Sequence, residues 1–164
     1  MWPFEDNPDD AFRNAVRQEF SPLADECGAT LKQIEPFIFG FVTDYAVLTV
    51  GAYPGHFRGI CVKLRRRENQ EPLSVKDGAD IGLANVEALM TGKVSAIHTK
   101  RQRWSSAEIT EEITGLAKIT KQVGLSFITS PKADWVGLRT FVDAKIEQAM
   151  REQPWRKKYS QNSN

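Results

Sequence analysis

The chain has 164 residues, of which 41% are hydrophobic and 26% are charged, and its formal net charge is +1. A single domain of this length buries a sizeable core, whereas two domains would each lie near the lower limit for independent stability. These figures exclude the collagen-like, disordered, membrane-spanning and disulfide-scaffold classes. The near-zero net charge gives no overall attraction to nucleic acid or anionic lipid.

The first predicted element is an amphipathic helix over residues 8–27. Asn7 is a favourable N-cap residue, and Pro8 stands at the first helical position. Pro22 is expected to kink or restart this helix, and Gly28 is placed to end it. Its apolar stripe, with spacings of three and four residues, consists of Phe12, Val16, Phe20, Leu23 and Cys27.

The following residues change to the pattern of β-strands. Alternating or β-branched segments predict strands over residues 37–42, 46–50 and 57–64, and residues 73–75 are a candidate edge strand. Thr43-Asp44 and the Tyr-Pro-Gly of residues 53–55 supply turn residues between them. Since short turns join antiparallel neighbours, we expect a meander.

Helical periodicity returns after residue 80. One helix is expected over residues 81–91, and a Ser105–Glu108 capping box begins a second that stops at Gly124. That second helix has Ile109 and Ile113 on its buried stripe and places Glu112 on its solvent face. Residues 125–128 are expected to be extended. A last helix, from Ser130-Pro131 to Pro154, has an inner face of Trp135, Leu138, Val142, Ile146 and Ala149.

The order of a helix, then strands, then helices predicts an α+β fold. We expect an antiparallel meander sheet of three to five strands with helices packed mainly on one face. Residues 1–153 are predicted to form a single domain, and residues 154–164 a disordered polar tail.

The two cysteines bear on the compartment. Cys27 falls on the apolar helix stripe and Cys61 lies between Ile60 and Val62, so we expect two buried free thiols and a reducing interior. The N-terminal residues carry acid where a secretory signal carries base. The cytoplasm is therefore the expected location.

The sequence contains no recognisable constellation for catalysis or metal binding. His56 and His98 lie on different predicted elements, and neither has the neighbouring Cys or His of a zinc site. Thr91-Gly92-Lys93 lacks the preceding glycine of a phosphate loop. We therefore expect no catalytic residue, no metal and no cofactor, with an enzyme of unrecognised type as one alternative.

Charge is distributed unevenly along the chain. Residues 1–44 hold three basic and nine acidic residues, whereas residues 45–104 hold ten basic and five acidic ones. Basic clusters at Arg65–Arg67 and Lys100–Trp104 combine cations with an aromatic ring, as in proteins that bind single-stranded nucleic acid. A nucleic-acid-binding accessory protein is thus a second alternative, although the net charge is low for that class.

The first half of the chain resembles a known class of proteins. A helix that ends at Gly28, followed by strand patterns over residues 37–42, 47–51 and 57–64, resembles the small cytoplasmic immunity proteins of bacterial toxin–immunity systems. This resemblance implies tight binding of one cognate toxin, without catalysis and without a cofactor.

The same hypothesis predicts where a partner protein binds. Aromatic and arginine side chains dominate the energetics of protein interfaces, and several gather at the expected hairpin tip between the second and third strands. The predicted contact residues are Tyr53, His56, Phe57 and Arg58 at this tip, together with Arg65, Arg66 and Trp104.

Overall fold

A computed structural model describes residues 7–52, 59–76, 78–99 and 105–153. The chain divides into two compact units, residues 1–133 and residues 134–164. The α+β fold lies in the first unit, and each unit is described by itself. The prediction of one domain reaching residue 153 stays a prediction.

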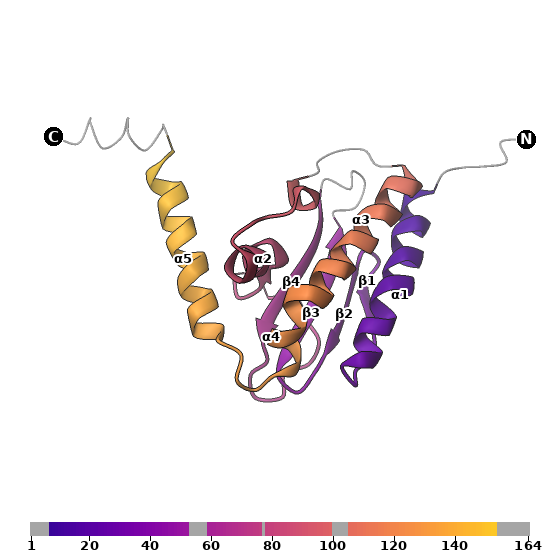
Figure 1. Cartoon of the computed structure of the whole chain (residues 1–164). Helices are drawn as coiled ribbons and strands as arrows, with labels where there is room; N and C mark the ends of the chain where they lie inside the picture. The colour runs from indigo at the N-terminus through magenta and orange to yellow at the C-terminus, as the bar shows by residue number, and fades with distance from the viewer. Residues whose placement is uncertain (1–6, 53–58, 77, 100–104, 154–164) are drawn as a thin grey trace, which may run out of the picture. The chain divides into compact units, whose positions relative to one another are not determined.

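The first unit contains a five-stranded antiparallel sheet in which spatial order follows chain order, so the predicted meander and α+β class are confirmed (Figure 1). The edge strands differ from the prediction. The sheet begins with an unpredicted strand and ends at residues 81–82 instead of 73–75. The strands are β1 (Lys32–Glu35), β2 (Ile38–Val42), β3 (Ala46–Ala52), β4 (Ile60–Arg66) and β5 (Ile81–Gly82).

Helices cover one face of this sheet, where α1 and α3 lie side by side (Figure 1). Asn7 caps α1 by accepting hydrogen bonds from the amides of Asp9 and Asp10 at 3.1 and 3.3 Å. No helix among the described residues is long and apolar enough to cross a membrane. The helical elements of this unit are α1 (Pro8–Glu26), α2 (Leu83–Thr91), the 3₁₀ turn η1 (Ala96–Thr99), α3 (Ser106–Ile119), the π-helical turn η2 (Thr120–Gly124) and α4 (Leu125–Thr129).

Three local predictions about the helices are corrected. Helix α1 continues through Pro22 as one element, so the helix does not restart there, and the kink stays a prediction. Residues 125–128 are helical, because the π-helical turn η2 carries the chain past Gly124 instead of stopping it there. Glu112 is only 2% exposed, so the buried side of α3 is wider than the stripe through Ile109 and Ile113.

The core lies between the helices and one face of the sheet. Phe41 of β2, Leu48 of β3 and Leu64 of β4 are register partners across three strands, and all three are fully or almost fully buried. Phe12 of α1 packs on Phe39 with a ring-centroid distance of 6.2 Å. Side chains alternate between the two faces along each strand, so the residues directly before and after Phe41, Leu48 and Leu64 point away from this core. We call this second face of the sheet the outer face.

The second unit contains α5 (Trp135–Arg151). The Asp134 side chain caps this helix by accepting a hydrogen bond from the Gly137 amide at 2.8 Å, so the helix begins later than Ser130-Pro131. Leu138 and Val142 of the predicted inner face are buried. Ile146 is 51% exposed and Ala149 is exposed, so the prediction is wrong for the last turns. The predicted tail at 154–164 lies outside the described residues.

Two strand glycines on the outer face provide a matched test of this packing. A β-carbon on Gly40 would collide with the Leu48 carbonyl oxygen and crowd Leu73 Cδ1 at 2.9 Å, whereas one on Gly51 would meet Ile38 Cγ1 at an ordinary 3.5 Å. We expect Gly40→Ala to lower the free energy of unfolding by about 2 kcal/mol, and Gly51→Ala to change it by less than about 0.5 kcal/mol. Urea unfolding of both variants measures this difference; equal losses would show that the outer face is packed differently.

Candidate functional site

The outer face of the sheet carries the candidate site. The register aligns Lys63 of β4, Thr49 of β3 and Gly40 of β2 in one row across three strands. The next row toward the other end of the strands holds Cys61, Gly51 and Ile38. Since Gly51 has no side chain, the centre of the second row is left empty.

A hollow of about 480 Å³ lies over this empty position. Its volume is within the range of ligand pockets, and most of its wall is apolar. The lining residues are Glu35, Pro36, Phe37, Ile38, Thr49, Gly51, Ala52, Cys61, Lys63 and Val75.

The described residues of the loop 67–80 lie over the outer face, and the loop contributes Val75 to one side of the hollow. Leu73 of this loop fills the space above Gly40, and Val75 reaches the wall of the hollow. A wall made of loop residues needs an anchor, because a loop buries few backbone hydrogen bonds of its own.

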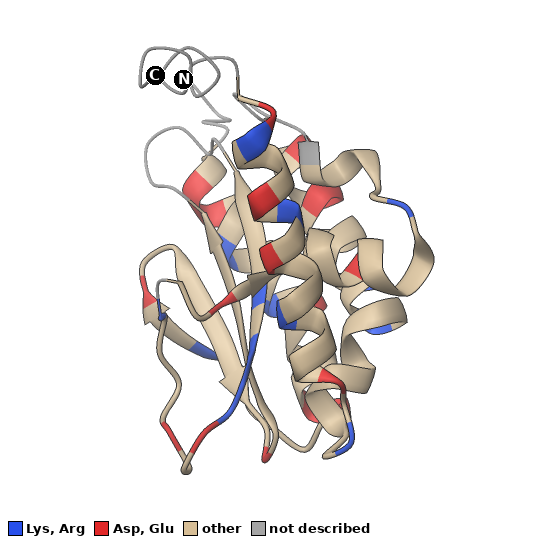
Figure 2. Cartoon of the chain, turned by 90° about the vertical axis from the view of Figure 1, so that its left-hand side faces the viewer, with Lys and Arg blue, Asp and Glu red and all other residues tan. Residues whose placement is uncertain are grey.

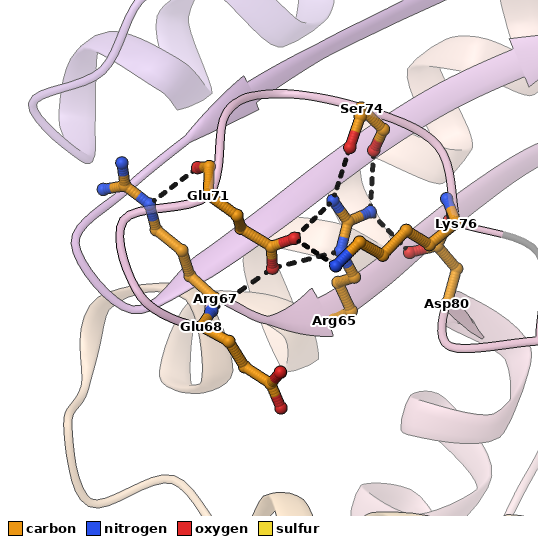
Figure 3. A network of polar contacts seen from close by, with 7 residues as sticks. All are labelled: Arg65, Arg67, Glu68, Glu71, Ser74, Lys76 and Asp80. Carbon is orange, nitrogen blue, oxygen red and sulfur yellow. Dashed lines mark hydrogen bonds and ion pairs between the residues drawn. The ribbon is translucent and has the colours of Figure 1, made fainter.

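Arg65 of β4 is that anchor (Figure 3). Its guanidinium donates to Asp80 Oδ1 at 2.8 Å, to the Ser74 carbonyl oxygen at 2.7 Å and to the Glu71 carboxylate at 3.3 Å. The Arg65 side chain is only 4% exposed. A buried guanidinium of this kind is stable only when its donors are satisfied, which these loop groups achieve.

A tight turn brings Glu71 back to Arg65. Asn69 and Gln70 both have positive φ, at 46° and 55°, and the Glu71 amide donates to the Glu68 carbonyl oxygen at 2.9 Å. Lys76, by its hydrogen bond, and Arg65 hold the pKa of the Glu71 carboxyl at about 2 against the opposing effect of burial. Glu71 is therefore ionised at every pH near neutrality, and the ion-pair network stays intact there.

Arg65 is consequently not a partner contact, which corrects the prediction for this residue. Its neighbour Arg67 also bonds within the chain, to the carbonyl oxygens of Thr43 at 3.0 Å and Glu71 at 3.1 Å. Arg66 is exposed, as a contact residue requires. The other predicted contact residues, Tyr53, His56, Phe57, Arg58 and Trp104, lie outside the described residues.

The structure also bears on the nucleic-acid alternative. Of the Arg65–Arg67 cluster, two guanidinium groups are held by intramolecular hydrogen bonds, which leaves Arg66 to meet a phosphate. Lys and Arg are interspersed with Asp and Glu along the ribbon (Figure 2). The Lys100–Trp104 cluster is not among the described residues, so its role stays a prediction.

Cys61 differs from the prediction of two buried thiols. Cys27 is half-buried, but Cys61 is exposed at the hollow, because Ile60 and Val62 take the core face and alternation turns Cys61 outward. Desolvation at the wall of the hollow raises the pKa of the Cys61 thiol, and Lys63 opposes this effect only in part. Both cysteines are free, as expected.

A second polar cluster lies apart from the hollow, between α2 and η1. Glu87 is buried and accepts hydrogen bonds from the Ser95 amide and from Ser95 Oγ at 2.7 Å, and His98 Nε2 stands 3.3 Å from its carboxylate. The Ser95 hydroxyl donates to Glu87 and not to His98, so this is not the arrangement that activates a serine nucleophile. The cluster ties residues 95–98 to α2. Within the described part of the chain, no group of three or more His, Cys, Asp or Glu is placed to hold a metal ion.

Sequence reasoning did not identify the hollow. Its main residues, Thr49, Gly51 and Lys63, are outward-facing positions of strands that were predicted, and a glycine within a strand is a signal of an unfilled space or a close approach. The pattern did not contain the position of the loop after β4, which brings Val75 to the wall of the hollow.

Comparison with known proteins adds no relative. The chain matches no protein-family model, and neither curated proteins nor solved structures show significant similarity to it.

The adjacent arginines of β4 allow a matched test of the anchor. Arg65→Met leaves the carboxylates of Glu71 and Asp80, 11% and 5% exposed, without their buried cation, and should lower the free energy of unfolding by about 3–5 kcal/mol. Arg66→Met should change it by less than about 0.5 kcal/mol. Chemical denaturation of both variants measures the two losses in the free energy of unfolding. Similar losses would show that Arg65 is a surface residue and not an anchor.

The raised pKa of Cys61 makes a prediction about its reactivity. The thiolate is the reactive form, so alkylation of a Cys27→Ser variant by iodoacetamide should rise about tenfold per pH unit and continue to rise above pH ~8.5, the ordinary thiol pKa. N-acetylcysteine is the reference compound. A rate that levels off at or below the pH of this reference would contradict the assignment of Cys61 to a desolvated wall.

Proposed function

We propose that this chain is a non-enzymatic protein-binding domain that holds its partner at the outer face of the sheet. The observation that carries the proposal is the apolar hollow, which is open to the surface and walled by an anchored loop. Protein interfaces derive most of their affinity from a few side chains that enter such desolvated pockets. A rigid wall adds affinity because less motion is lost on binding.

The proposal extends to the immunity-type inhibitors that the first half of the chain resembles. A protein of this kind binds one toxin and blocks its active site or a nearby surface, and it needs no catalytic group of its own. The free thiols of Cys27 and Cys61 support action in a reducing compartment, and we place it in the cytoplasm.

The chemistry of the hollow supports binding in preference to turnover. Its thiol has a raised pKa, which lowers the fraction of reactive thiolate at neutral pH. Among the described residues, neither member of the Glu87–His98 pair lines the hollow, so no imidazole base stands beside Cys61 there.

The test is to fill the hollow. Affinity purification from the native host identifies a partner, and the complex is then rebuilt from the two purified proteins. Gly51→Leu places an apolar side chain in the empty position and should weaken the rebuilt complex at least tenfold, about 1.4 kcal/mol. If the partner is a toxin, co-expression of the wild-type chain should rescue growth and co-expression of Gly51→Leu should not.

Thr110→Leu is the matched control, because it adds the same side chain at an exposed position of α3 on the opposite side of the sheet. This variant should bind as tightly as the wild type. If the partner binds Gly51→Leu with unchanged affinity, the outer face is not the binding surface.

A further inference from the structure

The two ends of the hollow differ in charge. Lys63 and Thr49 are register partners on β4 and β3, so their β-carbons lie about 5 Å apart on the same face. Glu35 stands on β1, three strands from Lys63 and two residues away in register, hence roughly 16 Å away. Between these ends the wall is apolar, with Pro36, Ile38 and Val75.

The polar groups at the Lys63 end are not used by the fold. Thr49 is only 4% exposed, yet its hydroxyl makes no hydrogen bond within the described residues. Its methyl group lies toward Gly40, 3.3 Å from where a β-carbon would stand, so the hydroxyl is the group available to the hollow. This hydroxyl is not sealed inside the protein, and Thr49 lines the hollow, so the hydroxyl can donate a hydrogen bond to a ligand group there.

The Lys63 ammonium is likewise a donor group that has no acceptor among the described residues. It is half-buried at the wall of the hollow and makes no ion pair with any other described residue. Arg65, two residues further along β4 on the same face, has its guanidinium bonded to three residues of the loop. Arg65 therefore serves to hold the fold together, whereas the Lys63 ammonium has no such role among the described residues and is available to a ligand.

We infer that the hollow receives an apolar side chain of the partner protein. A carboxylate of the partner, next to this side chain, binds at the Lys63 end of the hollow. The carboxylate accepts hydrogen bonds from the Lys63 ammonium and the Thr49 hydroxyl, and the apolar group fills the space above Gly51. The Lys63 end is the anchoring end because Glu35 is exposed and its charge is screened by water. This inference rests on the proposed function and names the chemistry of the partner segment.

The chemistry is tested with three probes of one shape: 3-phenylpropanoate, 3-phenylpropanamide and 3-phenylpropylamine. In ¹⁵N-resolved NMR titrations, the acid should shift the amide signals of Thr49, Gly51 and Lys63 saturably. The neutral amide should bind at least fivefold more weakly, and the amine should not bind. Equal binding of acid and amide, stronger binding of the amine, or no binding of the acid would each overturn the inference.

Two variants locate the effect. Gly51→Leu should abolish binding of the acid, and Lys63→Gln should make acid and amide bind equally. Lys32→Gln is the matched control, since Lys32 is an exposed lysine of β1 that does not line the hollow, and it should change neither affinity. If Gly51→Leu does not fold, the Lys63→Gln titration alone decides the outcome.

The rebuilt complex separates this inference from the proposed function. A partner that loses affinity with Gly51→Leu and also with Lys63→Gln, by at least fivefold, supports both. If the partner loses affinity with Gly51→Leu but binds Lys63→Gln as tightly as the wild type, the proposed binding surface stands and the inferred carboxylate contact is overturned. A partner indifferent to both variants overturns the surface and the inference together.

Discussion

The ion-pair network of Arg65 determines the form of the outer face. Arg65 bonds to loop residues that lie before, between and after Leu73 and Val75, and so holds these two side chains over the strands. The network links β4 to the loop through Glu71, Ser74 and Asp80. Because this network is buried, water cannot solvate a charge that loses its partner there, so removing one member is strongly destabilising. One arginine thus couples the sheet to the wall of the hollow.

Two glycines on neighbouring strands show how the loop changes the meaning of the same residue. Gly40 lies under Leu73, so its missing side chain allows the loop to pack closely on β2. Gly51 lies beyond the reach of Leu73, and its missing side chain leaves a space bounded by Ile38, Thr49 and Cys61. The first glycine belongs to the packing of the fold, and the second provides the volume of the candidate site.

The residues that sequence reasoning misjudged share a physical cause. Arg65 and Arg66 are adjacent and chemically identical in the sequence, but only the first meets the carboxylates of a loop that folds back over β4. Glu112 was expected on a solvent face and is buried, since the helical periodicity of α3 does not report how far neighbouring segments extend around it. Cys61 was expected in the core because its neighbours are apolar, whereas alternation places those neighbours and the thiol on opposite faces.

The sequence by itself determined the α+β class, the central strands and the capped starts of α1 and α3, because these depend on periodicity and on local hydrogen bonds within a few residues. It also determined which strand residues could face outward. Only the tertiary structure decided that Thr49, Gly51 and Lys63 form one end and the floor of a hollow, and that Arg65 holds the loop that brings Val75 to its wall. Those relations join residues from three strands and a loop, and the side-chain contacts that create them are not encoded in any local pattern.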